Sequence, residues 1–201
     1  MKLKDSQTYL NLARAYAGET MARTRYEFVE YGARKEGYKN IAELIDGVAY
    51  QEFNHARMLY TFIQTACDGA IPNIDVCAGY PFKEKWDLLE NLRLAAEDEA
   101  DEAERIYPEF ARVADEEGFK DIAGLFRNIA QVETCHKKLF LQLHDQLAGG
   151  TLYKKDKAVK WKCEDCGYEA TSTEAWVQCP LCQAKQGSIK LILDECPGNN
   201  A

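Results

Sequence analysis

The chain has 201 residues, of which 46% are hydrophobic, which is enough for one large core and a small additional module. Its formal net charge of -8 argues against nucleic acid and against an anionic membrane as partners. No apolar run reaches the length of about 18 residues that a membrane-spanning helix needs, so no membrane segment is expected. The N-terminal residues lack the apolar stretch of an export signal, and we therefore expect a cytoplasmic protein.

Most of the chain is predicted to form long helices, because apolar residues recur at helical spacing and helix breakers are few. The expected helices cover residues 5–36, 39–66, 84–117 and 120–147. Gly37 and Gly118 follow the first and third helices, where glycine commonly ends a helix. The segment 66–82 contains Gly69, Pro72, Gly79 and Pro81 and is predicted to be a loop.

The first helical pair is repeated in the second with an offset of 81 residues. EGYKNIAELI at 36–45 matches EGFKDIAGLF at 117–126, so two similar helical hairpins are expected to face each other. The loop between the hairpins has about 17 residues and reaches roughly 55 Å when extended, more than the roughly 42 Å of a 28-residue helix. The expected fold is therefore mainly α: a ferritin-like four-helix bundle with one long crossover.

Acidic and imidazole side chains interrupt the apolar stripe of every predicted helix. They are Glu19 on the first helix, Glu52 and His55 on the second, Glu99 and Glu102 on the third, and Glu133 and His136 on the fourth. The other acids of the third helix fall off its stripe and are expected to be solvated. An ionised carboxylate in a core is costly unless it is paired or bound to metal. Arg23 is the main cation expected nearby, and one cation cannot balance five carboxylates.

A site for two metal ions resolves this cost. One Glu from each of two helices and a Glu-x-x-His from each of the other two is a known ligand pattern in helix bundles. Here Glu19 and Glu99 are the single residues, and Glu52–His55 and Glu133–His136 are the pairs in repeat register. Oxygen donors with one imidazole for each metal favour iron or manganese.

The C-terminal part contains two C-x-x-C pairs, Cys163 with Cys166 and Cys179 with Cys182. In a chain without an export signal, this pattern favours a metal site over disulfides. Four thiolates suit zinc or iron, and the spacing alone favours a zinc ribbon slightly. The remaining cysteines are expected to be reduced thiols: Cys67, Cys77, Cys135 and Cys196. The expected domains are a bundle at 1–147, a linker at 148–160 and a four-cysteine domain at 161–201.

In their order along the chain, these motifs resemble the rubrerythrin family over about residues 5–193. The sequences WKCxxCGY at 161–168 and CPxC at 179–182 are similar to the iron knuckles of rubredoxin. They follow AGE at 17–19, E-x-x-H at 52–55 and 133–136, and E-x-x-E at 99–102, which is the rubrerythrin order. The resemblance implies iron in both sites. The implied ligands of two irons are Glu19, Glu52, His55, Glu99, Glu102, Glu133 and His136, and those of a third iron are Cys163, Cys166, Cys179 and Cys182. This favours iron over zinc at the cysteines, although Gln183 stands where the family usually has glycine.

The resemblance also implies an activity: an iron peroxidase of anaerobes that protects against oxidative stress by reducing hydrogen peroxide to water. Electrons would come from an NAD(P)H-dependent rubredoxin-type reductase, or from rubredoxin, through the cysteine-bound iron. A homodimer is implied, in which this iron serves the two-iron site of the other subunit. Tyr26 and Tyr107 match tyrosines that contact ligand carboxylates in the family, with ordinary core packing as the alternative.

Glu102 breaks the repeat, because the residue three positions after Glu19 is Ala22. The offset is 80 at Glu19 and Glu99 but 81 at Tyr26 and Tyr107, which indicates one extra residue and a π-bulge in the third helix. A seventh ligand lets one iron exchange Glu102 for His55. The resemblance points to the carboxylate for the ferric state and the histidine for the ferrous state.

Two other functions share these ligands. The first is iron oxidation or storage of the ferritin type, which a fused electron-transfer module argues against. The second is a non-enzymatic metal-binding protein with zinc in both sites.

Overall fold

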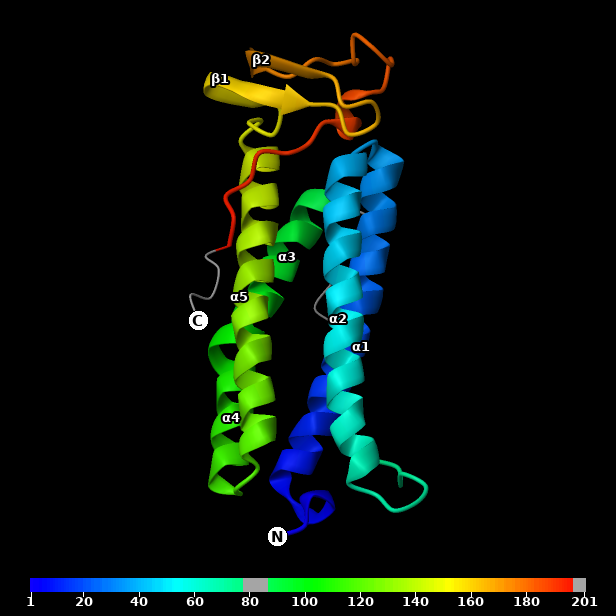
Figure 1. Cartoon of the computed structure of the whole chain (residues 1–201), viewed down its shortest axis with the longest axis vertical. Coiled ribbons are helices and arrows are strands. Elements are labelled where there is room, and N and C mark those ends of the chain that lie inside the picture. The colour runs from blue at the N-terminus through cyan, green and yellow to red at the C-terminus, as the bar shows by residue number, and fades with distance from the viewer. Residues whose placement is uncertain (78–86, 197–201) are drawn as a thin grey trace.

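The computed structural model describes residues 1–77 and 87–196 (Figure 1). Its elements are α1 (Gln7–Glu36), α2 (Lys39–Thr65), α3 (Leu88–Asp101), α4 (Tyr107–Glu116), α5 (Lys120–Ala148), β1 (Lys154–Lys162) and β2 (Glu169–Glu174). Within these ranges, no helix is both long enough and apolar enough to cross a bilayer. Gly79 and Pro81 of the predicted loop and positions 84–86 of the predicted third helix lie outside the described residues.

The helix ends follow from local residue choices. The Ser6 side chain accepts a hydrogen bond from the Tyr9 backbone N–H and so caps the start of α1. Gly37 has a φ of 90° and Gly118 a φ of 87°, which are left-handed conformations that end a helix most readily at glycine. Both predicted glycine caps are confirmed.

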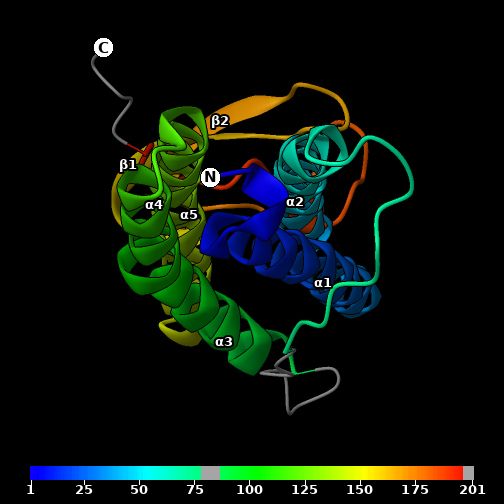
Figure 2. The same cartoon turned by 90° about the horizontal axis from the view of Figure 1, so that it is seen from below.

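The helices run up, down, down and up along one axis (Figure 1). The hairpin of α1 and α2 lies beside a second hairpin in which α3 and α4 pack on α5 (Figure 2). α2 ends at the opposite end of the bundle from the start of α3, as one long crossover requires (Figure 1). The predicted ferritin-like arrangement with one long crossover is confirmed.

The third predicted helix is divided into α3 and α4 by a π-helical turn at Glu102–Ile106. This turn absorbs the extra residue that the repeat offsets indicate, and it confirms the predicted bulge. Pro108 follows in the first turn of α4, where its missing N–H is tolerated best.

Two separate apolar cores fill the bundle. The upper core contains Ile41, Ile45, Leu92 and Phe140 among others, and the lower core contains Leu12, Leu59, Phe126 and Ile129 among others. Between the two cores lies a buried layer of polar side chains: Glu19, Glu52, His55, Glu99, Glu133 and His136. On each helix the apolar pattern therefore continues on both sides of a short polar interval.

The C-terminal module caps the end of the bundle where α1 turns into α2 (Figure 1). Strands β1 and β2 are antiparallel, and Trp161, Ala175 and Ile189 form a small core beneath them. Within residues 148–160, the expected linker, α5 ends at Ala148 and β1 begins at Lys154. Pairing with β2 orders these residues.

Close backbone contact fixes the module on the bundle. The Asn40 side chain donates a hydrogen bond of 2.8 Å to the carbonyl of Ile189, and Lys39 pairs with Asp165. Gly187 lies so close to the Gly37 turn that a Cβ added there would collide with the Gly37 carbonyl oxygen. The side chain of any other residue at position 187 would push the module away from the bundle.

We therefore expect Gly187→Ala to loosen the module, at a cost of about 1–3 kcal/mol in the free energy of unfolding. Hydrogen exchange should accelerate at the Gly37 turn and at the two cysteine loops. Gly124→Ala is the control, because a Cβ there meets no atom within 4 Å and alanine favours the helix. Unchanged exchange in Gly187→Ala would contradict the tight docking.

Candidate metal centres

Two groups of four buried ligands lie in the polar layer of the bundle. One group contains Glu19, Glu52, His55 and Glu133, and the other contains Glu52, Glu99, Glu133 and His136. Within each group, one ligand atom from every residue lies within 4.8 Å of the others. Glu52 and Glu133 belong to both groups, so their two oxygens each face a different metal position.

The histidines turn their Nδ1 atoms toward the shared carboxylates. The Nδ1 of His55 lies 3.1 Å from Glu52 Oε2 and 3.0 Å from Glu133 Oε1. The Nδ1 of His136 lies 3.0 Å from Glu52 Oε1 and 2.6 Å from Glu133 Oε2. In both Glu52 and Glu133, one carboxylate oxygen lies next to His55 and the other lies next to His136. This arrangement places one imidazole at each metal position.

The polar layer has a deficit of hydrogen bonds. Within the described part of the chain, six of its buried atoms make none: Glu19 Oε2, Glu52 Oε1, Glu99 Oε2, both oxygens of Glu133, and His136 Nδ1. A buried polar atom without a partner is costly. Lone pairs that converge from four helices fit two divalent cations, and the donor set of oxygen with one imidazole for each metal fits iron.

The charges in this layer perturb one another strongly. Burial, together with the charges of Glu133 and Glu52, raises the pKa of Glu99 to about 8. Burial opposes the charging of His55, but the close carboxylates of Glu133, Glu19 and Glu52 raise its pKa to about 12. In the metal-free chain, the two imidazoles therefore act as the cations of the layer.

Two buried tyrosines hold the single carboxylates from opposite sides. The Tyr26 hydroxyl donates to Glu99, and the Tyr107 hydroxyl donates to Glu19. Burial and the neighbouring carboxylates raise the pKa of both phenols well above the ordinary value. These contacts go beyond core packing, the alternative that the sequence left open.

Glu102 lies beside the first group and belongs to neither group. Its Oε1 lies 3.9 Å from the position that a Cβ on Gly18 would occupy, so it reaches toward the α1 turn that carries Glu19. Burial, followed by the charge of Glu19, raises the pKa of Glu102 well above its ordinary value. The structure therefore brings six of the seven predicted bundle ligands together. The seventh, Glu102, lies next to Glu19 and outside both ligand groups.

Gln51 is a residue that the sequence analysis did not single out. Its Oε1 accepts a hydrogen bond of 2.6 Å from the Nε2 of His136, when Nε2 carries the proton. This leaves Nδ1 free for a metal, since a ligating histidine commonly donates its other N–H to an acceptor. The repeat counterpart of Gln51 is Val132, and valine cannot accept a hydrogen bond. A search for unequal residues in the repeat would have found this difference.

Arg23 does not lie where the sequence suggested. Its side chain is 42% exposed, pairs with Glu27 and lies over the ring of Phe53, outside the polar layer. Arg25 instead reaches the third helix and pairs with Asp98. Arg23 and Arg25 lie about 200° apart around α1. The sequence pattern predicts Arg23 on the inner side, whereas Arg25 is the one that faces the third helix.

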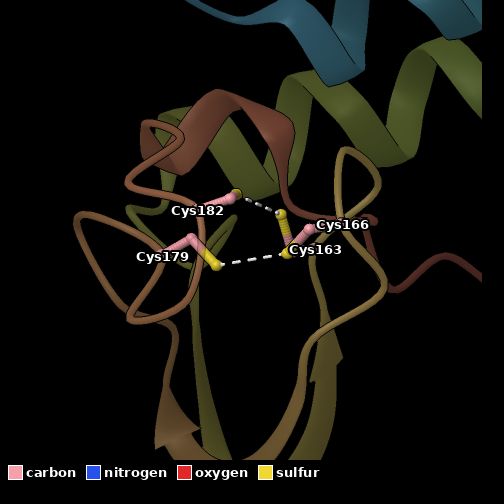
Figure 3. Close-up of side chains that lie close together, drawn as sticks. All are labelled: Cys163, Cys166, Cys179 and Cys182. Carbon is pink, nitrogen blue, oxygen red and sulfur yellow. Dashed lines mark hydrogen bonds between the residues drawn. The ribbon is translucent and has the colours of Figure 1, made fainter.

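The four cysteines of the C-terminal module also converge (Figure 3). The sulfurs of Cys163 and Cys182 are 3.7 Å apart, and those of Cys166 and Cys179 are 3.6 Å apart. Four sulfurs about 2.3 Å from a central metal would be about 3.8 Å apart at tetrahedral angles. The site therefore has the size of a metal–sulfur tetrahedron.

The two cysteine loops have closely similar backbones. The N–H of Gly167 donates to the Cys163 carbonyl, and the N–H of Gln183 donates to the Cys179 carbonyl. Gly167 has a φ of 76° and Gln183 a φ of 64°. The glycine-like conformation expected at position 183 is therefore present, and a side chain there costs about 1–2 kcal/mol.

One prediction about the remaining cysteines is wrong. Cys135 and Cys196 form a disulfide across 61 residues of sequence, whereas Cys67 and Cys77 are free thiols as expected. Nothing in the spacing of Cys135 and Cys196 reveals this contact, because the C-terminal segment must first fold back along α5.

Comparisons with known proteins agree with this architecture. The family model described as Rubrerythrin matches residues 11–144. Rubrerythrin of Clostridium perfringens is 42% identical over 190 residues, covering 94% of this chain and 96% of that protein. Rubrerythrin of Porphyromonas gingivalis is 38% identical over 184 residues, covering 92% and 89%.

Solved structures show the same likeness. A nigerythrin structure described as fully reduced and all ferrous is 26% identical, with a TM-score of 0.60, and covers 94% of this chain and 90% of its own. Bacterioferritin of Mycobacterium tuberculosis is 19% identical with a TM-score of 0.61, which shows a shared fold alone. The carboxylate–histidine layer and the four-cysteine cluster match the iron centres of rubrerythrins and nigerythrin.

We expect Glu133→Gln to leave fewer than two irons in the bundle, because it removes the negative charge that both metal positions share and replaces one of the two oxygens with an amide nitrogen. Total iron for each chain would be measured by elemental analysis, and the cysteine-bound part by its visible absorption. Glu104→Gln is the control, since Glu104 is an exposed acid paired with Lys137. A full pair of irons in Glu133→Gln would show that the ligands are misassigned.

Proposed function

Because this chain belongs to the rubrerythrin family, we propose that it is a peroxidase that reduces hydrogen peroxide to water at a two-iron site in the bundle. Members of the family are generally oxidoreductases with such sites. The observation that carries the proposal is the presence in one chain of two metal positions sharing Glu52 and Glu133 and of a separate four-cysteine site. The first suits a two-electron reaction, and the second suits the delivery of single electrons.

The reaction takes up two protons and two electrons for each peroxide and releases two water molecules. When bound, two ferrous ions supply both electrons. The chain has to hold the irons, exclude bulk water and provide protons. Tyr26 and Tyr107 keep their protons on hydroxyls aimed at ligand carboxylates, and Glu102 is half-buried with a raised pKa. These groups are the proton carriers that the site offers.

We further propose that Glu102 and His55 exchange as ligands at the position that also includes Glu19. Glu102 supports this by its place beside Glu19, outside both ligand groups. A ferric ion gains more than a ferrous ion from an anionic ligand, so the carboxylate suits the oxidised state. Gln51 supports His55 as the exchanging residue, because His136 is held by this extra hydrogen bond and Val132 offers none to His55.

The cysteine-bound iron would act as the electron relay, and a second subunit would complete the path. The module sits against the Gly37 turn, and Glu52 lies 13 residues further along α2 than Lys39, or about 20 Å. This separation within one chain favours delivery to the partner subunit of a homodimer.

An exposed aromatic face supports the homodimer. Phe28 and Tyr50 are 60% and 67% exposed on the hairpin of α1 and α2, with Tyr31 and Phe53 also exposed. Large apolar groups gathered on a surface commonly mark an interface. We propose that a second copy of the chain covers this face.

The electron donor is proposed to be an NAD(P)H-dependent rubredoxin-type reductase or rubredoxin itself, in the cytoplasm of an anaerobe. Both the donor and the location are proposed from membership of the family.

Iron oxidation and storage of the ferritin type is the second candidate, supported by the shared bundle and ligands. The four-cysteine module favours the peroxidase, because storage needs no dedicated electron supply. Comparing reductase-driven peroxide consumption with the amount of iron retained for each chain separates the two. A red colour of the oxidised protein would exclude zinc at the cysteines.

Replacing one buried cysteine tests the relay. We expect Cys179→Ser to abolish donor-driven turnover, while the bundle still binds two irons and reacts once with peroxide after chemical reduction. Cys77→Ser is the control, because Cys77 is an exposed thiol outside the cluster. Donor-driven turnover that survives the loss of the cysteine-bound iron would refute the relay.

Removing Glu102 tests the ligand exchange. We expect Glu102→Ala to keep both irons in the reduced form and to lower peroxidase turnover about 10–100-fold, the usual scale for groups that tune a metal site. Glu104→Ala, an exposed acid in the same π-helical turn, should keep full turnover. Crystals of the oxidised and reduced wild type should show one iron displaced between Glu102 and His55. Identical ligands in the two states would contradict the exchange.

A further inference from the structure

The last described residues, which we call the C-terminal strap (191–196), run back along α5 from the cysteine module (Figure 1). Three helix side chains bind its backbone. Gln146 donates to the carbonyl of Ile192 at 3.0 Å, Gln142 donates to that of Asp194 at 3.1 Å, and Lys138 donates to that of Glu195 at 2.7 Å. These donors are four residues apart, so each turn of α5 holds the next part of the strap.

The strap ends at a covalent link. Cys135 lies one turn before Lys138 on the same face of α5, and it is joined to Cys196 with a Cα–Cα distance of 5.5 Å. The three hydrogen bonds between α5 and the strap therefore place Cys196 next to Cys135. The repeat counterpart of Cys135 is Asn54, so the ligand pattern of the bundle does not call for a cysteine here.

The strap forms one wall of an open pocket of about 430 Å³ between α2 and α5. Gly47, Gln51 and His136 line the inner side of this pocket, and Leu193 and Cys196 line the strap side. His136 also faces the metal positions through its Nδ1, so its ring separates the pocket from the metals. Movement of the strap away from α5 would widen access to the hydrogen bond of Gln51 to His136 and to the edge of the metal site.

We propose that Cys135 and Cys196 are a second peroxide-reactive site of this protein, whose disulfide fixes the strap against α5 beside this pocket and slows exchange between solvent and the metals. The sulfur of one thiol attacks a peroxide oxygen, breaks the O–O bond and becomes a sulfenic acid as one water leaves. The second sulfur then displaces the hydroxyl, which leaves as another water while the S–S bond forms. Two thiols are oxidised by two electrons, and one peroxide is reduced.

A dithiol reductant reduces the disulfide by exchange and is itself oxidised to a disulfide. The strap is then held by the packing of Leu191 and Leu193 on the upper core and by its hydrogen bonds. These bonds are largely at the surface, where water competes for the same groups. The disulfide thus distinguishes a closed oxidised form from a form that opens more often. This proposal rests on the proposed peroxidase function, because its oxidant is the same hydrogen peroxide. Its test, however, requires no peroxidase turnover.

The first measurement concerns the covalent link. Iron-loaded protein is treated with a phosphine to reduce the disulfide, given one equivalent of peroxide, alkylated and digested. We expect a cross-linked peptide pair that contains Cys135 and Cys196, formed before Cys67 is oxidised. Oxidation of Cys67 with no such pair would overturn the proposal.

The second measurement concerns access, at a constant iron oxidation state. We expect a hydroxamate chelator to remove ferric iron from the bundle several-fold faster from Cys196→Ser, and from phosphine-treated wild type, than from untreated wild type. Cys67→Ser keeps the strap disulfide and should behave as wild type. Equal rates in all four samples would overturn the role of the strap, even if the disulfide forms.

Discussion

The structure depends on the cost of placing charged carboxylates between two apolar cores. Glu19, Glu52, Glu99 and Glu133 are each at most 1% exposed, and water cannot solvate them there. In the metal-free chain, His55 and His136 balance part of the charge, and the raised pKa of Glu99 shows that the balance is incomplete. Two iron ions complete it, since they give the converging lone pairs a partner. The helices, the tyrosines and the two cores then serve to hold this layer in place.

The polar layer is nearly symmetric between the two repeats. The proposed chemistry is assigned to the residues that break this symmetry. Glu52 and Glu133 correspond in the repeat and belong to both ligand groups. Glu102 has no counterpart, and the π-helical turn that it begins brings an additional carboxylate beside Glu19. Gln51 likewise has no functional counterpart and holds one histidine in place.

The sequence predicts those features that depend on local spacing. The helices, the glycine caps, the long crossover, the Glu-x-x-His pairs and the bulge after Glu99 all follow from periodicity and repeat register. It fails where a contact depends on how distant segments meet. Nothing local to Cys135 points to a partner 61 residues away. The apolar pattern of the first helix likewise puts Arg23 on the inner side, whereas contact with the third helix is made by Arg25, about 200° away. The sequence does not predict the strand that begins at Lys154, because pairing with β2 orders β1.

The most direct test of the account is a titration of the fully reduced, iron-loaded protein with hydrogen peroxide in the absence of oxygen, followed by Mössbauer spectroscopy. The first peroxide added for each chain should convert two ferrous ions in the bundle into a magnetically coupled diferric pair. The iron bound by Cys163, Cys166, Cys179 and Cys182 should supply electrons only afterwards. A bundle iron pair that stays ferrous, or two ferric ions that are not coupled, would contradict a shared peroxide-reducing site bridged by Glu52 and Glu133.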